Sequence, residues 1–328
     1  MAERGNRVTI LAYHRIDTPA NPDKLDLSPT LIDASPGAFD AQMKWLAEQY
    51  NVISARDLFM AVRDGKRLPE RAVVITFDDG YMCFVETALP ILRKYGLPST
   101  VFVPTAFADD PVRPFWWDTI HKVLSQTTKD APDIPGVGLV PLSTKVERDA
   151  AYSALVDVIE HMEAGKVAGM VEDIAGACEV EPSDRKHVMG WQELERLAED
   201  DDVTFAPHTR HHAILAQTGG AALQAEIEGS WKDLKEHIAQ PLPLLAYPNG
   251  QPYAVNTASR EAARRAGMVG AVTMVAGVNR IGTTDPFLLH RSGATAGQSL
   301  VRFKLSISPA GGVLRRVKRL WQAPAQFA

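Results

Sequence analysis

Two adjacent carboxylates, Asp78 and Asp79, end an apolar run of the sequence. The run, residues 73–75, consists of β-branched side chains, which is typical of a strand buried on both faces, and Gly80 follows the carboxylates. In α/β proteins the carboxyl ends of such strands carry catalytic and ligand groups. Neighbouring negative charges repel each other unless a cation lies near them or they point apart, and a glycine turn lets both face one site. An Asp-Asp-Gly sequence also forms ordinary turns, so this motif alone allows either interpretation.

A histidine pair follows a second apolar run. His208 and His212 come after residues 203–205, which we expect to form a short strand. A four-residue spacing on one helical turn places both imidazoles on one face, the usual way to hold one divalent metal ion from one segment. Such pairs also arise by chance, and His211 offers the alternative three-residue spacing. Together with one carboxylate from another strand end, the pair would supply the three-ligand, open-position pattern of a hydrolytic metal site.

Both clusters resemble signatures of the polysaccharide deacetylases of carbohydrate esterase family 4, the nodulation-protein-B-like family. Residues 76–80, Thr-Phe-Asp-Asp-Gly, resemble its first motif, and residues 208–212, His-Thr-Arg-His-His, resemble its second. Residues 244–250, Leu-Leu-Ala-Tyr-Pro-Asn-Gly, resemble the third motif in the branch that acts in exopolysaccharide and surface-glycan synthesis, and residues 8–15 resemble its opening strand. The resemblance fades in the middle of the chain.

The resemblance implies a metal-dependent amide hydrolase. Asp79, His208 and His212 would bind a divalent ion, with Zn the first choice and Co, Ni or Mn as alternatives, and Asp78 would be the general base. The ion would lower the pKa of a bound water toward ~7 and polarise the substrate carbonyl. The expected reaction removes an N-acetyl group from an amino sugar of a polysaccharide, surface glycan or glycan precursor. The alternatives are a deformylase or deacetylase acting on a small lipid-linked or nucleotide sugar, and an inactive glycan-binding homologue.

An amide also needs a general acid, because its amine is a poor leaving group. The candidates are His14, at the end of the first expected strand, and His290, in a Leu-Leu-His sequence that fits the family's late Leu-x-His motif. We favour His14, because the branch resembled here usually lacks a histidine at the late position. Familiar members also carry, in the third motif, an arginine that orients the base. Ala246 stands there in this chain, and we expect Arg291 to replace it from the following strand.

Substrate contacts are expected near the third motif and near an aromatic run. Asn249 marks the position where the resemblance implies a backbone N–H for the oxyanion, with Tyr247 close by. Trp116 and Trp117 stand between prolines and could stack on the apolar face of a pyranose, although packing anchors are the common role of such residues. Arg113 could meet an anionic group of the substrate, although a solvated arginine is the common case.

Strand and helix patterns alternate along the chain, and this alternation predicts an α/β fold with a parallel sheet or barrel. The resemblance specifies a distorted (β/α) barrel of about seven strands in residues 1–302, with a helical insertion at about residues 106–190. We expect a loop at residues 17–37. Strands are expected at residues 8–13, 51–54, 73–75, 99–103, 203–205, 244–247 and 270–275. Helices are expected after residue 35 and at residues 55–64, 85–95, 191–199, 223–238 and 258–266.

The overall composition is that of an ordinary globular protein. The net charge of −5 gives no reason to expect a nucleic-acid partner, and two cysteines are too few for a disulfide framework. The polar residues 1–7 and the lack of an apolar run of ~20 residues predict a cytoplasmic protein. Residues 303–328 form a basic amphipathic tail, which could lie on the inner, anionic face of a membrane or pack as a terminal helix with a solvated basic face.

Overall fold

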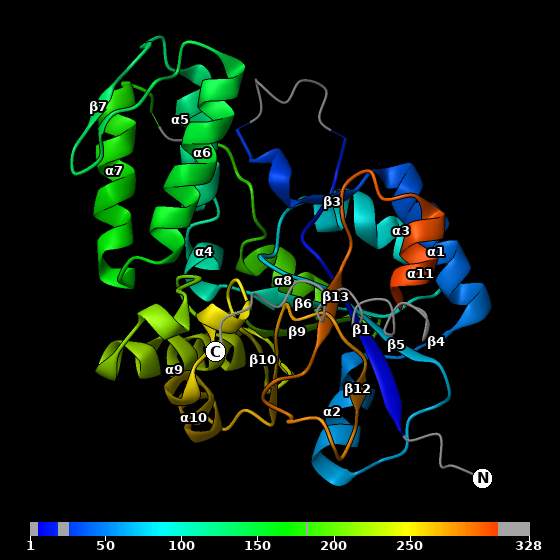
Figure 1. Cartoon of the computed structure of the whole chain (residues 1–328). Coiled ribbons are helices and arrows are strands. Elements are labelled where there is room, and N and C mark those ends of the chain that lie inside the picture. Colours follow the sequence, from blue (N-terminus) through cyan, green and yellow to red (C-terminus); the bar gives the residue numbers. More distant parts are fainter. Residues whose placement is uncertain (1–5, 19–25, 182, 308–328) are drawn as a thin grey trace, which may run out of the picture.

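The computed structural model describes residues 6–18, 26–181 and 183–307 of the 328-residue chain. Parallel strands surround the centre of this part of the chain, and helices cover their outer side (Figure 1). The strands of the barrel are β1 (Arg7–Tyr13), β5 (Ala72–Phe77), β6 (Ser99–Val103), β9 (Val203–Pro207), β10 (Leu244–Ala246), β11 (Gly270–Val272) and β13 (Arg291–Gly293).

The hydrogen-bonded ladder of the barrel is interrupted, which makes the barrel a distorted one. β13, β1, β5, β6 and β9 form one continuous parallel sheet, whereas β10 and β11 form a separate parallel pair. The N–H of Leu242 donates to the carbonyl of Phe205 at 2.8 Å and joins the two on one side. A single parallel bridge between Val272 and Leu289 joins them on the other. The predicted fold class is confirmed.

Short strands at the amino ends of β5 and β1 are β4 (Asn51–Val52) and β12 (Asn279–Arg280).

Side chains alternate along each strand, and this alternation decides which way the functional residues point. On β5, Ile75 belongs to the outer cluster beneath the helices, whereas Val74 packs inside the barrel. Continuing the same alternation puts Asp78 on the inner side at the carboxyl end of β5. On β9 it puts His208 on the inner side, two residues after the buried Ala206. The two clusters found in the sequence therefore face the same mouth of the barrel.

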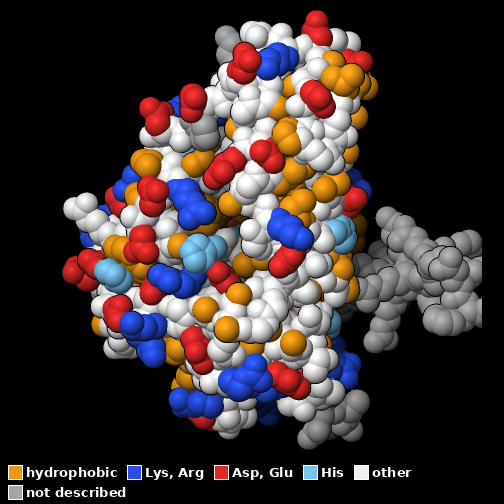
Figure 2. Space-filling model, turned by 90° about the vertical axis from the view of Figure 1, so that its left-hand side faces the viewer, with side chains coloured by type: hydrophobic (Ala, Val, Ile, Leu, Met, Phe, Trp, Pro, Cys, Tyr) orange, Lys and Arg blue, Asp and Glu red, His pale blue; other side chains and the backbone are white. Residues whose placement is uncertain are grey.

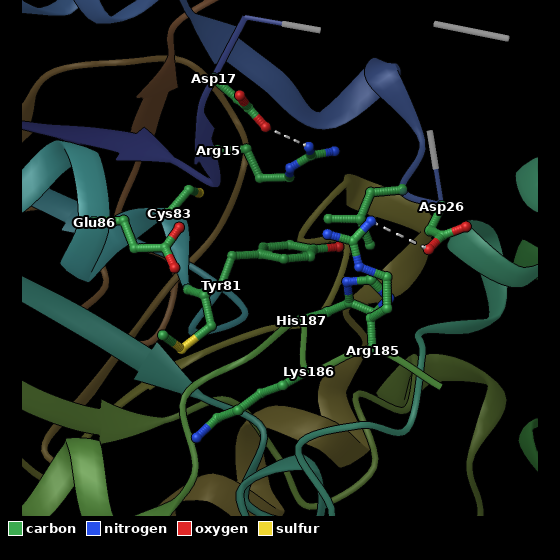
Figure 3. Close-up of a pocket in the computed structure, with 11 residues that line it drawn as sticks. Arg15, Asp17, Asp26, Tyr81, Cys83, Glu86, Arg185, Lys186 and His187 are labelled. Atoms are coloured by element: carbon green, nitrogen blue, oxygen red, sulfur yellow. Dashed lines mark hydrogen bonds and ion pairs between the residues drawn. The ribbon is translucent and has the colours of Figure 1, made fainter. Parts of the chain in front are cut away.

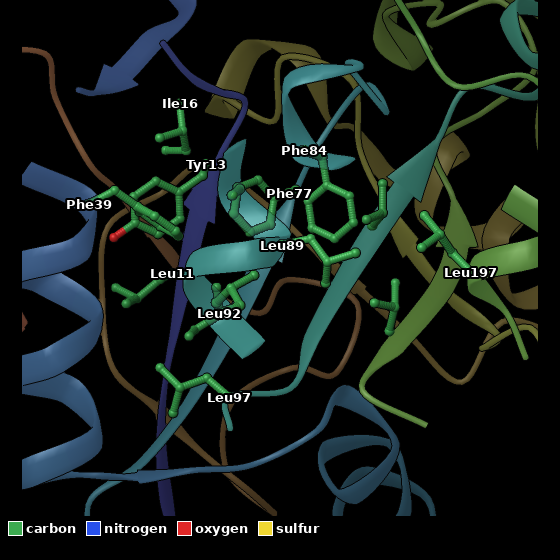
Figure 4. Close-up of a cluster of buried hydrophobic side chains, with 14 of the residues drawn as sticks. Leu11, Tyr13, Ile16, Phe39, Phe77, Phe84, Leu89, Leu92, Leu97 and Leu197 are labelled. Carbon is green, nitrogen blue, oxygen red and sulfur yellow. The ribbon is translucent and has the colours of Figure 1, made fainter. Parts of the chain in front are cut away.

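Aromatic side chains hold the outer face of β1 and β5 against helix α1 (Pro36–Gln49). The ring of Phe39 on this helix lies 5.2 Å from that of Tyr13 and 5.9 Å from that of Phe77. The ring of Phe84 lies 4.9 Å from that of Phe77 on the other side (Figure 4). Fully burying one such side chain contributes roughly 1.5–3 kcal/mol, so this cluster fixes the carboxyl ends of both strands.

The remaining helices of the barrel lie close to their expected positions. They are α2 (Ala55–Asp64), α3 (Leu89–Lys94), α8 (Trp191–Leu197), α9 (Gly220–His237) and α10 (Thr257–Arg265). The helix expected at residues 85–95 differs in one respect, because it begins as a π-helical segment, η3 (Phe84–Ala88). Pro90 at the start of α3 has no N–H to donate to the preceding turn, which accounts for the irregular start.

The segment expected as a loop at residues 17–37 contains a short strand, β3 (Ile32–Ala34), which pairs with β2 (Arg15–Ile16). This pair continues from the end of β1 and brings the segment across the barrel mouth. Residues 19–25 lie outside the described part of the chain.

The residues between β6 and β9 contain a bundle of helices. Its long members, α5 (Trp116–Gln126), α6 (Lys145–Glu160) and α7 (Val167–Cys178), stand together above one side of the barrel (Figure 1). They share a core of their own, to which Leu124 and Ile174 belong. These helices lie within residues 106–190, where the sequence analysis expected a helical insertion. Its shorter elements are α4 (Thr105–Asp109), β7 (Asp133–Ile134) and β8 (Gly138–Leu139).

The structure corrects the expected boundary before the C-terminal tail. Helix α11 (Leu300–Ile307) packs on the barrel, and its Phe303 is 1% exposed with its ring 6.2 Å from that of Trp45. Burial of an apolar face therefore continues past residue 302, and the basic stretch at residues 314–321 lies outside the described residues. Among the helices that the structure describes, none is long and apolar enough to cross a membrane.

The face at the left of Figure 1, formed by the insertion and helices α9 and α10, is shown in Figure 2. Acidic and basic side chains are interspersed on it rather than gathered by sign. This mixture is in keeping with the small net charge of the chain, −5.

Candidate metal centre

One carboxylate and two imidazoles meet at the mouth of the barrel. Oδ1 of Asp79 lies 3.5 Å from Nε2 of His208 and 3.3 Å from Nε2 of His212. One ligand atom of each residue lies within 4.8 Å of the others, so a single ion could contact all three. The structure thus brings together the three residues that the sequence analysis selected as ligands, from the ends of β5 and β9.

The chemistry of these three groups fits a divalent cation. Oδ1 of Asp79 is buried and has no hydrogen-bond partner among the described residues, which is costly for a carboxylate unless a cation lies beside it. Burial would raise the pKa of Asp79, but the neighbouring imidazoles His212 and His208 hold it below its usual value. Burial also lowers the pKa of His212 to about 4, so this imidazole is neutral and has a lone pair for a metal.

The backbone at this site is held in an uncommon conformation. Asp79, Thr209, His212 and Asn249 all have positive φ, between 55° and 70°. Non-glycine residues seldom adopt this left-handed region, and where they do, the surrounding structure must enforce it. Such conformations cluster at functional sites, and here four of them come from the ends of three barrel strands.

The expected helical turn at residues 208–212 is wrong, although the two imidazoles do converge, with ring centroids 4.8 Å apart. The segment is a loop, and its backbone forms hydrogen bonds to the residues that follow the neighbouring strand β6. The carbonyls of Thr209 and Arg210 accept from the N–H groups of Thr105 and Ala106. The left-handed residues in this loop turn the chain back, and this conformation cannot be read from the spacing of the histidines.

His208 is oriented by a backbone carbonyl. Its Nδ1 lies 2.8 Å from the carbonyl oxygen of Ala246 at the end of β10, in a buried position. Because a carbonyl can only accept, Nδ1 carries the proton and Nε2 keeps its lone pair toward Asp79. The third motif therefore contributes to the centre through its backbone.

Asp78 is held by Arg291, as expected from the sequence. Nη1 and Nη2 of Arg291 donate to the two carboxylate oxygens, each at 2.6 Å, and the two side chains are 0% and 3% exposed. Burial would raise the pKa of Asp78, but the Arg291 guanidinium holds it well below its usual range. Asp78 is therefore an oriented carboxylate that can accept a proton, and the arginine reaches it from β13 rather than from the third motif.

The Arg291→Ala variant is expected to unfold about 3–5 kcal/mol more easily than the wild type, because it leaves Asp78 buried without a counter-charge. We also expect a lower kcat, since the carboxylate loses its orientation. Denaturant unfolding and steady-state kinetics check both results. Arg260→Ala, at a partly exposed pair with Asp285, is the control and should change stability by about 1 kcal/mol or less. Unchanged stability and kcat in Arg291→Ala would show that the pairing has no role.

His14 lies at the end of β1, where a partner fixes it. The backbone N–H of His14 donates to Oδ2 of Asp33 at 2.5 Å, and Nδ1 of its imidazole lies 3.2 Å from the same oxygen. Burial lowers the pKa of His14, but the charges of Asp33, Asp79 and Asp78 outweigh this effect and raise it to about 9. His14 is therefore protonated at neutral pH and suited to donate a proton. The sequence analysis missed Asp33, because a single acid in an expected loop carries no signal.

The position of His290 along its strand favours His14 over it as the acid. β13 runs parallel to β1 with Arg291 opposite Ile10, so His290 is level with Thr9. It lies five residues below His14, about 16 Å along a strand at roughly 3.3 Å per residue. The ring of His290 packs against Gly277, where an added Cβ would lie 2.7 Å from its Cγ. The long side chain of Arg291 spans the distance to Asp78, and an imidazole cannot.

Trp117 and Tyr247, which the sequence analysis suggested as sugar contacts, are both buried in the structure. Trp117 is 7% exposed, its ring lies 4.7 Å from that of His212, and its Nε1 donates to the hydroxyl of Tyr81 at 3.0 Å. Tyr247 is 1% exposed and donates to the carbonyl of Phe287 at 3.2 Å. Both large rings gain more from packing than from solvent exposure. Trp117 packs against His212, a candidate metal ligand.

Three further candidates lie outside the centre or at its edge. His211 is hydrogen-bonded to Glu226 at 2.7 Å with its side chain 47% exposed, so it is not a ligand. The guanidinium of Arg113 lies over the ring of Phe107, 5.1 Å from its centroid. Trp116 is partly exposed, with its ring 5.3 Å from that of Trp117, and its role in substrate binding stays a prediction.

A polar cavity of about 250 Å³ lies beside Tyr81, two residues beyond the candidate ligand Asp79. Charged side chains of both signs line it and pair with one another, Arg15 with Asp17 and Arg185 with Asp26 (Figure 3). The candidate metal ligands Asp79, His208 and His212 are not part of its wall. The hydroxyl of Tyr81 donates to Asp118. Asp118 is buried, and this burial raises its pKa to about 7.

The protein is thus an α/β barrel with a candidate metal centre at its mouth. The centre consists of a carboxylate and two imidazoles, and an aspartate held by an arginine lies beside it. The family model described as polysaccharide deacetylase matches residues 65–271, well over half of the chain. The protein therefore belongs to the polysaccharide deacetylase family, and the resemblance noted in its motifs is confirmed.

Individual relatives agree with this assignment. The chain is 31% identical over 107 residues, 32% of its length, to poly-beta-1,6-N-acetyl-D-glucosamine N-deacetylase of Escherichia coli. It is 35% identical over 71 residues, 22% of its length, to the protein of that name from Staphylococcus aureus. These matches span only 15% and 24% of the relatives' own lengths.

Solved structures show the same fold. The Streptococcus pyogenes deacetylase PplD, solved in complex with acetate, has a TM-score of 0.61 at 17% identity and covers 93% of this chain and 100% of its own. A de-N-acetylase from Aggregatibacter actinomycetemcomitans has a TM-score of 0.58 at 20% identity, with 92% and 99% covered.

Proposed function

We propose that this protein is a metal-dependent N-deacetylase that removes the acetyl group from an amino sugar of a glycan or glycan precursor. The observation that carries the proposal is the Asp79–His208–His212 group beside the arginine-held Asp78 in a chain of the polysaccharide deacetylase family. The names of the matched relatives favour N-acetylglucosamine as the sugar. A divalent ion, Zn in the first instance, would be held by Asp79, His208 and His212.

Amide hydrolysis needs a group that accepts a proton and a group that donates one, and Asp78 and His14 take these two roles. When bound, the ion supplies Lewis-acid polarisation and lowers the pKa of water. Asp78, ionised and oriented by Arg291, accepts the proton of the attacking water. His14, protonated at neutral pH, donates a proton to the nitrogen of the leaving amine. The N–H of Tyr247 already donates to the carbonyl of Val272, so a backbone donor for the oxyanion must come from the following residues, near Asn249.

The role of His14 predicts a particular pH dependence. Because the acid must carry its proton, kcat/KM should be retained at neutral pH and should fall as the pH rises through the pKa of His14, which Asp33 holds above the usual value. The His14→Gln variant is expected to lose about 10²-fold in kcat and to lack this decrease. His237→Gln, whose imidazole pairs with Glu195 on the surface, should keep the profile of the wild type. A decrease that persists in His14→Gln would assign it to another group.

The activity itself is tested by acetate release from a panel of N-acetylated sugars. Oligomers of N-acetylglucosamine, an N-acetylated nucleotide sugar and an N-formyl analogue would be incubated with the protein, with and without a chelator. We expect release from at least one N-acetylated sugar, its loss with chelator and its return on adding Zn. Release of formate alone would favour the deformylase alternative. A metal-loaded protein that binds glycan but releases no acyl group from any of them would favour the inactive, glycan-binding alternative.

A further inference from the structure

Glu160, a carboxylate of the helical insertion, contacts the loop that follows β10. This residue is the last of helix α6. Its Oε1 accepts from Nδ2 of Asn249 at 3.0 Å, and its Oε2 accepts from the hydroxyl of Tyr253 at 2.8 Å. Nδ2 of Asn249 also donates to that hydroxyl at 2.9 Å. In Figure 1 the lower end of α6 lies beside the segment that follows β10, in agreement with these contacts.

The ring of Tyr253 is held rigidly and yet remains exposed. Both hydrogen-bonding capacities of its hydroxyl are used, and its ring stacks on that of His161, with centroids 4.9 Å apart and an angle of 26° between the planes. The residue is nevertheless 39% exposed. Trp117 and Tyr247, two of the three aromatic residues that the sequence suggested for sugar contact, are 7% and 1% exposed. An exposed aromatic ring fixed by its own polar end offers contact area at a low cost in conformational entropy.

Tyr253 lies within a short distance of the candidate metal centre. Ala246 accepts the hydrogen bond that orients His208, and Asn249 follows three residues later. At 3.8 Å between consecutive Cα atoms, the Cα of Asn249 lies at most about 11 Å from that of Ala246. The hydroxyl of Tyr253 is in direct contact with Asn249. The exposed ring therefore stands at the rim of the barrel mouth, within reach of a short oligosaccharide that extends from the centre.

We propose that Tyr253 forms a saccharide subsite, in which its exposed ring stacks on the apolar face of a pyranose next to the sugar being deacetylated. Glu160 positions the ring from the insertion, and Asn249 positions it from the barrel. The proposal rests on the proposed function to the extent that the ligand is a glycan. It adds a binding residue outside the metal centre and gives the insertion a part in recognising more than one sugar unit.

The test compares substrates of different length. For the wild type and Tyr253→Ala, kcat/KM would be measured on N-acetylglucosamine and on its tetramer. We expect the ratio of the tetramer value to the monosaccharide value to fall about 10-fold in Tyr253→Ala, mainly through KM, which is the scale of an aromatic stacking contact. Tyr253→Phe retains the ring but loses the bonds to Glu160 and Asn249, so its ratio should lie between those of the wild type and Tyr253→Ala. Tyr95→Ala removes a tyrosine that bonds Asp40 elsewhere on the surface and should leave the ratio unchanged.

Binding without turnover separates this proposal from the proposed function. Tetramer affinity would be measured by titration in the Asp78→Asn background, with and without Tyr253→Ala, and we expect about 10-fold weaker binding when the ring is absent. An unchanged affinity and an unchanged ratio would overturn the subsite. An equal loss on monosaccharide and tetramer would also overturn it, because the ring would then only pack the loop. A wild type that binds the tetramer through Tyr253 but releases no acetate would refute the proposed function and leave the subsite standing.

Discussion

Replacement of His208 by alanine is expected to weaken the binding of a divalent ion at least ~10²-fold and to remove acetate release. The reason is that the ion loses one of three protein ligands, and loss of a group that merely orients a ligand already costs 10–100-fold. Asp79→Ala should have a similar effect, because its Oδ1 lies between both imidazoles. Calorimetric titration with Zn or Co measures the affinity, and circular dichroism shows whether the variant is folded.

His211→Ala is the matched control for this experiment. His211 is three residues from His208 in the same loop, but its imidazole is hydrogen-bonded to Glu226 and turned to the surface. This variant should bind the ion as the wild type does. A folded His208→Ala protein with wild-type affinity would show that these imidazoles do not hold the ion.

The Asp78→Asn variant is expected to lose about 10²–10⁴-fold in kcat while it still binds the ion within a few-fold of the wild type. An amide of the same shape cannot take a proton from water, and Asp78 is not part of the proposed ligand group. Single-turnover acetate release and metal titration on the same preparation separate the two properties.

Asp285→Asn, at a partly exposed pair with Arg260, serves as the control and should keep kcat. If Asp78→Asn were as active as the wild type, the general base would have to be another group. If it lost the ion together with its activity, Asp78 would be a ligand rather than a base.

The parts of the site that follow from local rules could be predicted from the sequence. The alternation of side chains along β5 and β9 places Asp78 and His208 on the inner side, and strand ends of an α/β barrel meet at one mouth. The pairing of Arg291 with Asp78 could also be predicted, for a chemical reason. A buried carboxylate needs a counter-charge, and Ala246 leaves the usual place for it empty.

The parts that depend on tertiary packing could not be predicted. Whether an aromatic ring is covered depends on what packs over it, so Trp117 and Tyr247 are buried while Tyr253 is not. The left-handed backbone of His212 depends on bonds to another strand end, which the expected helical turn ignored. The contact of Glu160 with Asn249 joins residues 89 apart in the chain, and neither residue type signals it.

The register of β13 against β1 also favours one of the two candidate acids, His14. The Leu-Leu-His letters fit a motif, but register fixes the height of a residue in the barrel. His290 is level with Thr9, whereas His14 is at the mouth beside Asp33. For the role of general acid, the position of a residue along its strand is therefore more informative than a match to a short sequence motif.

The central claim is that Asp79, His208 and His212 share one divalent ion, and anomalous diffraction from a crystal soaked in Zn tests it most directly. We predict one strong peak about 2.0–2.2 Å from a carboxylate oxygen of Asp79 and from Nε2 of each histidine. A well-ordered site that shows no peak between these three side chains at saturating Zn, or a peak bound by other residues, would contradict the claim.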